Sequence, residues 1–377
     1  MNRAERLMAT LRGCPVDRPA VCFYEINGLD ERCDPADPFN IYTHPSWTPL
    51  LELAREKSDR IVLRNVPFPA AHDPLAERSE TQTWFENGSC YQRQTLRCAK
   101  RTLTATTRRD PDVNTIWQVE HLLKGEDDLR AYLELPPSEA CGEPEPSGVI
   151  AAEHELGDSG IVMIDTPDPL CCAAALFDMA TFTVVASTTP RLFHRLLERF
   201  AAELQLRTEA VSKALPGRLW RIYGPEYASP PYLRPALFRE YVTAYDTPLV
   251  QTIQAHCGYA RIHSHGRLKL ILDAIAATGC DALDPIEPPP QGDIELAEVR
   301  ERYGRQMVLF GNLEASDLEN LPPTEFASRI RRALDEGTHG PGRGFVLMPS
   351  ACPYGRILSP RALRNYELMV EMVQSPK

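Results

Sequence analysis

Two histidines separated by one residue are the most prominent candidate for chemistry in this chain. His263 and His265 stand at the end of a short apolar-flanked run, and Gly266 ends that run. Side chains two positions apart on a strand face the same side, as two ligands of one metal ion must. A pair of hydrogen-bonded structural histidines explains this spacing equally well. The pair therefore predicts either a metal site or a polar cluster.

A cysteine offers a third ligand. Cys352 follows the apolar run 345–348, which has the character of a second strand. Ligands at the ends of separate strands can meet at the mouth of a barrel. Two nitrogens and one sulfur with an open position form a catalytic zinc pattern, and such soft donors disfavour calcium and magnesium. We therefore predict an enzyme in which His263, His265 and Cys352 bind zinc.

Three acids are candidates for catalytic roles. Glu226 could be a fourth ligand, although a place in a first helical turn or loop explains it as well. Asp284 and Glu287 lie in a proline-rich segment, whose rigidity suits substrate orientation or acid–base catalysis. A proline-stiffened connection is the alternative for both. Asp293 fits better as the N-cap of a helix over 294–303.

Other polar residues stand where expected strands end, and they could orient a substrate. For the segment Gly311-Asn312 a simple turn is an equal alternative. His256 is expected to end a helix and Cys257 to be buried, so neither is assigned to the site. The predicted substrate-binding residues are Tyr24, Glu25, Tyr223 and Asn312.

The elements that must position these residues alternate along the chain. Helical patterns at 192–212, 268–275 and 363–370 separate or follow short apolar runs. Strand–helix alternation predicts an α/β fold with a parallel sheet. Eight strands close most naturally into a (β/α)₈ TIM barrel, here with an N-terminal helix; the alternative is an open doubly wound sheet. The expected strands are 20–24, 60–64, 161–164, 219–223, 260–263, 282–284, 307–310 and 345–348.

One segment interrupts the alternation. Three threonine-rich, roughly alternating runs lie between 81 and 107, and Asn87-Gly88 separates the first two. This pattern predicts an antiparallel meander inserted into a β→α connection. We expect the insert to cover about 81–147, with 136–147 as an exposed closing loop. The chain 1–377 is otherwise predicted to be a single barrel domain.

Composition excludes several classes of protein. The chain is 43% hydrophobic and 25% charged, as in ordinary globular proteins, and its net charge of −11 argues against nucleic acid as a partner. Apolar stretches fall short of the ~20 residues needed to span a bilayer. The first residues lack the apolar core of a signal peptide, so a cytoplasmic protein is expected. Eleven irregularly spaced cysteines do not form a disulfide framework, and most are expected to be buried thiols.

These residues carry a resemblance to a known family. The segment 263–266, the helical segment ending near Asp284, the run 311–314 and the strand leading to Cys352 resemble the uroporphyrinogen decarboxylase superfamily. The segments 3–6 and 15–20 resemble the start of its members. The resemblance covers nearly all of the chain outside 81–147 and implies a TIM barrel.

The superfamily has two main activities, cofactor-free decarboxylation and zinc-dependent methyl transfer to or from a corrinoid protein. The decarboxylases carry an Arg-Gln-Ala-Gly-Arg motif that grips substrate carboxylates, whereas this chain has Phe-Tyr-Glu-Ile-Asn-Gly at 23–28. With the arginines missing and an acid present, a polycarboxylate would be repelled. The methyltransferases carry His-x-Cys and a distant Cys as zinc ligands, which implies His263, His265 and Cys352 here.

Histidine at the second ligand position departs from the family pattern. Neutral imidazole in place of thiolate makes zinc a stronger Lewis acid, which favours polarising an ether oxygen. We therefore expect transfer of a methyl group from a small methylated donor to the corrinoid of a partner protein, with an O-methyl compound as the favoured donor. The chain has no Asp-x-His-x-x-Gly corrinoid motif, so cobalamin must come on that partner. A metal-free lyase and a methylcorrinoid:thiol methyltransferase are the alternatives, and a homodimer is one expected state.

Overall fold

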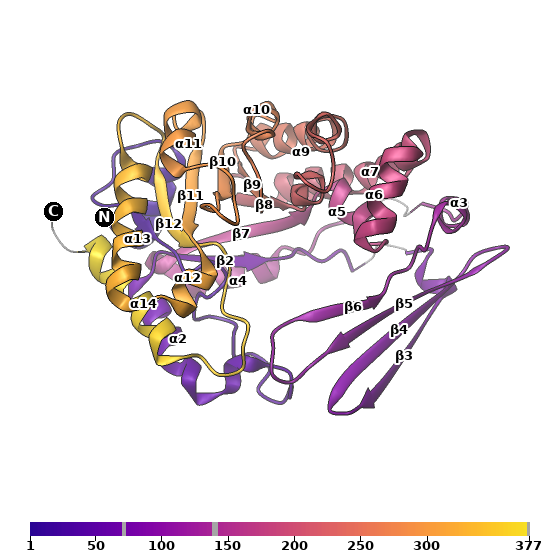
Figure 1. The fold of residues 1–377 in the computed structure, drawn as a ribbon, viewed down its shortest axis with the longest axis horizontal. Helices are drawn as coiled ribbons and strands as arrows, with labels where there is room; N and C mark the ends of the chain where they lie inside the picture. The colour runs from indigo at the N-terminus through magenta and orange to yellow at the C-terminus, as the bar shows by residue number, and fades with distance from the viewer. Residues whose placement is uncertain (70–72, 138–141, 375–377) are drawn as a thin grey trace.

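A curled, parallel eight-stranded sheet forms the centre of the molecule (Figure 1). The computed structural model describes residues 1–69, 73–137 and 142–374. The strand order is β1-β12-β11-β10-β9-β8-β7-β2, and every pairing is parallel. The strands are β1 Ala20–Val21, β2 Arg60–Arg64, β7 Gly160–Pro167, β8 Leu219–Tyr223, β9 Tyr259–Ser264, β10 Ala282–Pro285, β11 Val308–Leu313 and β12 Phe345–Pro349.

A buried aspartate joins the two ends of this sheet. The backbone N–H of Asp59 donates to the carbonyl oxygen of Val21 at 2.7 Å, and the Asp59 carboxylate accepts from the Val21 N–H at 2.8 Å. Arg6 and Arg18 donate to the same carboxylate at 2.6 and 2.8 Å, which compensates its charge. The first and last strands of the order therefore lie side by side, as in a TIM-like fold.

Helices surround the sheet, and the buried apolar side chains form two cores, an outer one under the helices and an inner one at the centre of the sheet. Alternate strand residues point outward under the helices or inward to the centre. Leu7 and Leu11 of α1 pack into the inner core, so the N-terminal helix closes the amino end of the sheet. The helices are α1 Arg3–Leu11, α2 Thr48–Lys57, α3 Glu126–Leu133, α4 Ser147–Leu156, α5 Pro169–Ala174, α6 Met179–Thr188, α7 Pro190–Ala214, α8 Pro235–Phe238, α9 Ala244–Ala255, α10 Leu272–Ala276, α11 Leu296–Tyr303, α12 Ala315–Asn320, α13 Pro323–Thr338 and α14 Pro360–Gln374.

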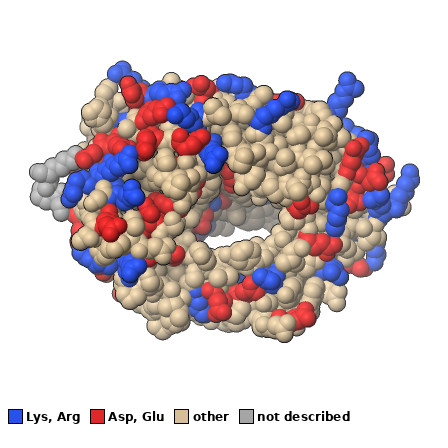
Figure 2. Space-filling view, in the orientation of Figure 1, with Lys and Arg blue, Asp and Glu red and all other residues tan. Residues whose placement is uncertain are grey.

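A separate antiparallel sheet lies between β2 and β7 in the sequence. Its order is β3-β4-β5-β6, and an opening separates it from the curled sheet (Figure 2). The meander is attached at both ends: Asn114 donates its N–H to the Tyr354 carbonyl, and Leu123 to that of Leu176. Its strands are β3 Ser79–Glu86, β4 Ser89–Arg97, β5 Thr102–Arg109 and β6 Ile116–Glu120.

The expected strands of the curled sheet are all present, with differences at their edges. The first is shorter than predicted, because the chain leaves the strand before Tyr24, which has a φ of 56°. The meander is confirmed but has a fourth strand, β6, which the threonine pattern did not indicate. The helix predicted over 268–275 begins only at Leu272. On α7, Leu206 is exposed, whereas Leu196, Leu197 and Leu204 are buried.

Three local predictions were wrong. Asp293 is not an N-cap, because its carboxylate accepts the N–H of Lys269 at 2.9 Å and α11 begins later, at Leu296. Cys257 is exposed rather than buried, since it takes the left-handed position (φ 62°) after His256, the C-cap of α9. Most cysteines were expected to be buried, but among the described cysteines only Cys22 and Cys280 are buried.

The adjacent Cys171 and Cys172 are half-buried at α5. Within the closing loop 136–147, residues 138–141 lie outside the described part, and the others are exposed or half-exposed. In the described chain, every helix is too short or too polar to cross a bilayer.

Candidate active site

His263 projects from β9 into the centre of the curled sheet beside Asp284 of β10. The two residues are direct neighbours in the β9–β10 register, so both side chains face inward. The Nδ1 of His263 lies 2.7 Å from Oδ2 of Asp284. Burial raises the pKa of Asp284, but Arg261 and His263 outweigh it and hold that pKa at about 2. The carboxylate is therefore ionised at neutral pH and orients the imidazole.

His265 repeats this arrangement one step further along the chain. Its Nδ1 lies 2.8 Å from Oε1 of Glu287, whose Oε2 accepts the N–H of Gly266 at 2.7 Å. Burial lowers the pKa of His265, but the hydrogen bond and charge of Glu287 outweigh burial, so the pKa is above the ordinary 6.5. The rings of His263 and His265 are nearly perpendicular, with centroids 4.6 Å apart. The predicted pair thus shares one face, and each ring is held by its own carboxylate.

A hydrogen-bonded chain crosses the site from β7 to β10. Arg221 of β8 donates to both carboxylate oxygens of Asp165 at 2.7 and 2.9 Å and to the Tyr24 hydroxyl at 3.0 Å. That hydroxyl lies 3.4 Å from Nε2 of His263. Burial raises the pKa of Tyr24 well above its ordinary value, so the hydroxyl keeps its proton. The network therefore holds a phenol between a guanidinium and an imidazole.

Arg261 forms an ion pair with Asp284 and so stabilises the site. Its guanidinium is almost fully buried, its Nε lies 3.0 Å from Oδ1 of Asp284, and it stacks over the Phe310 ring at 4.9 Å. A buried cation next to a buried carboxylate offsets the cost of burying either charge. Arg261 thus positions Asp284, and through it His263.

Cys352 does not join the histidines. Its Sγ lies 3.9 Å from the carbonyl oxygen of Phe23 and packs against the outer apolar core. Burial raises the pKa of this thiol above its ordinary range. Within residues 1–69, 73–137 and 142–374, no three His, Cys, Asp or Glu side chains are grouped so that they could hold a metal ion. The described geometry brings two of the three predicted zinc ligands together, and Cys352 is not grouped with them among the described residues.

The remaining predicted site residues lie around this network. Glu25 forms an ion pair with Arg221 at 3.0 Å, and the Arg221 guanidinium lies over the Tyr223 ring at 5.6 Å. Glu226 lies in a 3₁₀ turn after β8, and its Oε2 is buried without a hydrogen-bond partner in the described chain. Asn312 is on β11, and its side chain forms no hydrogen bond with the network among described residues.

Arg221 and Arg261 carry much of the network but were not assigned to the site from the sequence. A signal was present, since Arg221 and Arg261 stand two residues before Tyr223 and His263 and so share their inward face. An arginine inside an apolar run needs a buried carboxylate partner. That rule could have identified both residues.

The carboxy-terminal part of the chain carries a family signature. Residues 166–375 match uroporphyrinogen decarboxylase (URO-D), which is more than half of the sequence and includes β8 to β12. The chain belongs to the uroporphyrinogen decarboxylase family. Members of this family are enzymes. The predicted superfamily is therefore confirmed.

The other comparisons add little. No curated protein matches the sequence. Among solved structures, the crystal structure of D-psicose 3-epimerase in the presence of D-fructose is similar over 60% of this chain and 91% of that chain, with 9% identity and a TM-score of 0.31. Such a distant likeness carries no information about activity.

Proposed function

We propose that this family member transfers a methyl group from a small methylated donor to the corrinoid of a partner protein. The favoured donor is an O-methyl compound. One observation carries the proposal: Asp284 and Glu287 each bind the Nδ1 of a neighbouring histidine. Carboxylates that bind one ring nitrogen leave the other for a metal ion and fix its direction. The Nε2 of His265 has no hydrogen-bond partner among the described residues.

The two imidazoles fit a zinc ion as donors, and the described position of Cys352 does not. Zinc, when bound, would act as a Lewis acid on the leaving oxygen of the donor. Tyr24 keeps its proton and can donate a hydrogen bond to an oxygen of the methyl compound at the mouth of the barrel. Arg221 fixes that hydroxyl at 3.0 Å, and Glu25 forms an ion pair with Arg221. Glu226 offers a buried, unpaired carboxylate oxygen near His265.

Methyl transfer can be tested directly. Methoxyaromatics, methylamines and methyl thiols are mixed with the protein and a reduced corrinoid protein, and the cobalamin spectrum is followed. We expect methylcobalamin from an O-methyl donor, and loss of both zinc and turnover in His263→Ala and His265→Ala. His256→Ala is the control, because His256 pairs with Glu209 on the surface at 3.0 Å. No methylcobalamin with any donor would exclude the proposal.

A metal-free lyase is the second candidate, and the hydrogen-bonded chain favours it. Asp165, Arg221, Tyr24, His263 and Asp284 are linked without a metal, which is an arrangement suited to moving protons at a substrate. The protein stripped with a chelator distinguishes the two functions. A lyase keeps its activity there, whereas the methyltransferase loses it and recovers it with zinc.

A further inference from the structure

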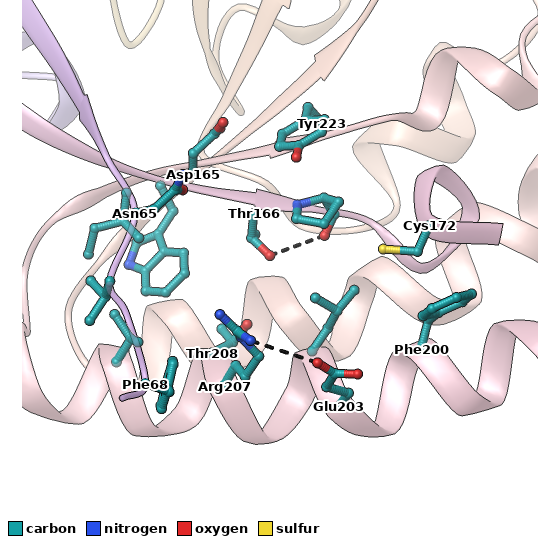
Figure 3. Close-up of a pocket in the computed structure, with 16 residues that line it drawn as sticks. Asn65, Phe68, Asp165, Thr166, Cys172, Phe200, Glu203, Arg207, Thr208 and Tyr223 are labelled. Atoms are coloured by element: carbon teal, nitrogen blue, oxygen red, sulfur yellow. Dashed lines mark hydrogen bonds and ion pairs between the residues drawn. The ribbon is translucent and has the colours of Figure 1, made fainter. Parts of the chain in front are cut away.

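A pocket of about 360 Å³ lies between the carboxyl ends of β2, β7 and β8 and one face of α7 (Figure 3). It is on the outer side of the curled sheet, because Ile164 and Trp220, which line it, are register neighbours that belong to the outer apolar core. Asp165 and Arg221, one position further along each strand, turn to the inner side and join the network of the candidate active site. The pocket and that network therefore lie on opposite sides of β7 and β8.

Apolar side chains form much of the pocket wall. Residues three and four apart on α7 share one face of the helix, and this face lines the pocket opposite the strands. Concave sites of this size and lining hold small ligands. A ligand seated here needs an apolar body, because it contacts Val66, Phe68, Ile164, Phe200, Leu204, Val211 and Trp220.

Two nearly buried polar side chains on the wall have no hydrogen-bond partner in the described chain. Thr208 is 1% exposed and Trp220 3% exposed, yet neither the threonine hydroxyl nor the indole N–H is paired. Other helical threonines, such as Thr183 and Thr247, donate to the carbonyl four residues earlier. A buried donor without a partner costs free energy until a ligand or water accepts from it. The pocket therefore offers hydrogen-bond donors to a ligand oxygen.

Arg207 adds a positive charge to the same wall. Figure 3 shows Arg207 and Thr208 projecting from α7 toward Thr166 of β7. The Arg207 guanidinium lies 4.7 Å from the centroid of the Phe68 ring and 3.7 Å from the Glu203 carboxylate, but it forms no hydrogen bond with a described residue. The planar fork of guanidinium N–H groups matches the two oxygens of a carboxylate. Its free donors therefore favour a carboxylate on the ligand.

The acidic groups around the pocket leave room for one anion. Asp165 lines its edge, but both carboxylate oxygens accept hydrogen bonds from Arg221, at 2.7 and 2.9 Å, on the inner side of the sheet. Burial raises the pKa of Tyr223 above its ordinary range and that of Cys172 to about 12, so both side chains are neutral. Among the described lining residues, Glu203 is then the acid that competes with a ligand for Arg207.

We propose that this pocket binds a small monocarboxylate with an apolar body, whose carboxylate binds Arg207 and Thr208. The apolar body fills the space lined by Trp220 and Leu204. The site goes beyond the proposed function, because it lies outside the barrel and requires neither zinc nor a methyl group.

Titration calorimetry with octanoate, 1-octanol and octylamine on the full-length protein tests the ligand class. Octanoate is expected to bind with a Kd below about 1 mM. Its affinity should exceed by roughly tenfold that of 1-octanol, which has no charge, and that of octylamine, which carries the opposite charge. No saturation by octanoate, or equal or tighter binding of either other compound, would overturn the proposal.

Two isosteric variants on one turn of α7 test the charge. Arg207→Gln should weaken octanoate binding by roughly tenfold, whereas Glu203→Gln should strengthen it by about threefold, because the competing carboxylate is gone. Binding of 1-octanol should change in neither variant. Both side chains are partly exposed, so both variants should fold, and thermal unfolding verifies this. Changes of the same sign in both variants, or no change in either, would show that the guanidinium does not hold the carboxylate.

Further variants on α7 locate the site. Leu204→Trp fills the pocket and should weaken octanoate binding by roughly tenfold or more, whereas Leu206→Trp is the matched control because Leu206 is 53% exposed. Thr208→Val removes one donor with little change of shape and gives a second test if Leu204→Trp does not fold. Unchanged affinity in Leu204→Trp and Thr208→Val would place octanoate elsewhere. These measurements need no corrinoid protein, so octanoate binding without methyl transfer would reject only the proposed function, and methyl transfer without octanoate binding only the pocket.

Discussion

The Nδ1 of His263 and the Oδ2 of Asp284 lie 2.7 Å apart at neighbouring positions of β9 and β10. The carboxylate is fully buried and also faces Arg261 at 3.0 Å, so it has little freedom to move. It acts through His263, because a fully buried group cannot touch a substrate at the mouth. Asp284 was predicted as a catalytic acid, and from these contacts we expect a positioning role, which the next variant tests.

Asp284→Asn should lower activity by roughly 10–100-fold, because a ligating histidine that loses its carboxylate loses its orientation. The variant also leaves Arg261 without its charged partner, which should cost about 3–5 kcal/mol of unfolding free energy. Steady-state kinetics and urea unfolding measure the two effects. Asp293→Asn is the control from the same connection, since Asp293 contacts only a backbone N–H in the described chain. Unchanged activity in Asp284→Asn would contradict the positioning role.

Cys352→Ala should keep most of the bound zinc, whereas His265→Ala should lose it. The described structure places the Cys352 thiol against the Phe23 carbonyl rather than beside the histidines. Metal analysis of each purified variant, with the folded state checked by thermal unfolding, gives the comparison. Equal zinc loss in both variants would restore the thiol as a ligand, as the family resemblance implies.

Local apolar runs were sufficient to predict the strands, because a strand buried on both faces appears in the sequence as a nearly continuous apolar run. The site was harder to predict from the sequence. The pairing of Asp284 with His263 depends on register between strands, which spacing along the chain does not show. Glu287 and Asp284 were recognised as rigid acids, but their hydrogen bonds to imidazoles became visible only in three dimensions.

Cys352 illustrates the opposite case. Its place after a strand is as predicted, yet its Sγ lies 3.9 Å from the Phe23 carbonyl oxygen and is not grouped with the two imidazoles in the described structure. A strand end fixes where the backbone emerges, whereas the following loop decides the direction of a side chain. The late start of α10 has a similar cause, since residues after Gly266 form turns before the helix begins.

Gly224→Ala should destabilise the protein by more than about 1 kcal/mol. Gly224 has a φ of 115°, and a Cβ there would lie 2.2 Å from the Cβ of Cys171. Urea unfolding measures the loss. Gly88→Ala is the matched control, because Gly88 also has positive φ (82°) but open space around it, so only the backbone penalty remains. Equal losses in the two variants would show that the contact with Cys171 relaxes.

Asp246→Asn should stabilise the protein at pH 8 and leave it nearly unchanged at pH 4. Both carboxylate oxygens of Asp246 are buried without hydrogen-bond partners in the described chain, and burial raises its pKa well above the ordinary 3.8. Asp168 shows the same upward shift in pKa, from burial and then the charge of Asp246.

The sign of the pH effect follows from proton binding. The folded protein holds the Asp246 proton more tightly than the unfolded chain, so its stability falls as pH rises above the unfolded pKa, until the folded pKa is passed. Asparagine cannot lose that proton and avoids the penalty. In Asp246→Asn, the difference between the melting temperatures at pH 4 and pH 8 should therefore shrink by about 2 °C or more. Asp335→Asn, at an exposed position, should keep the wild-type difference. The same separation between the two pH values in Asp246→Asn and the wild type would mean that folding does not raise the pKa of Asp246.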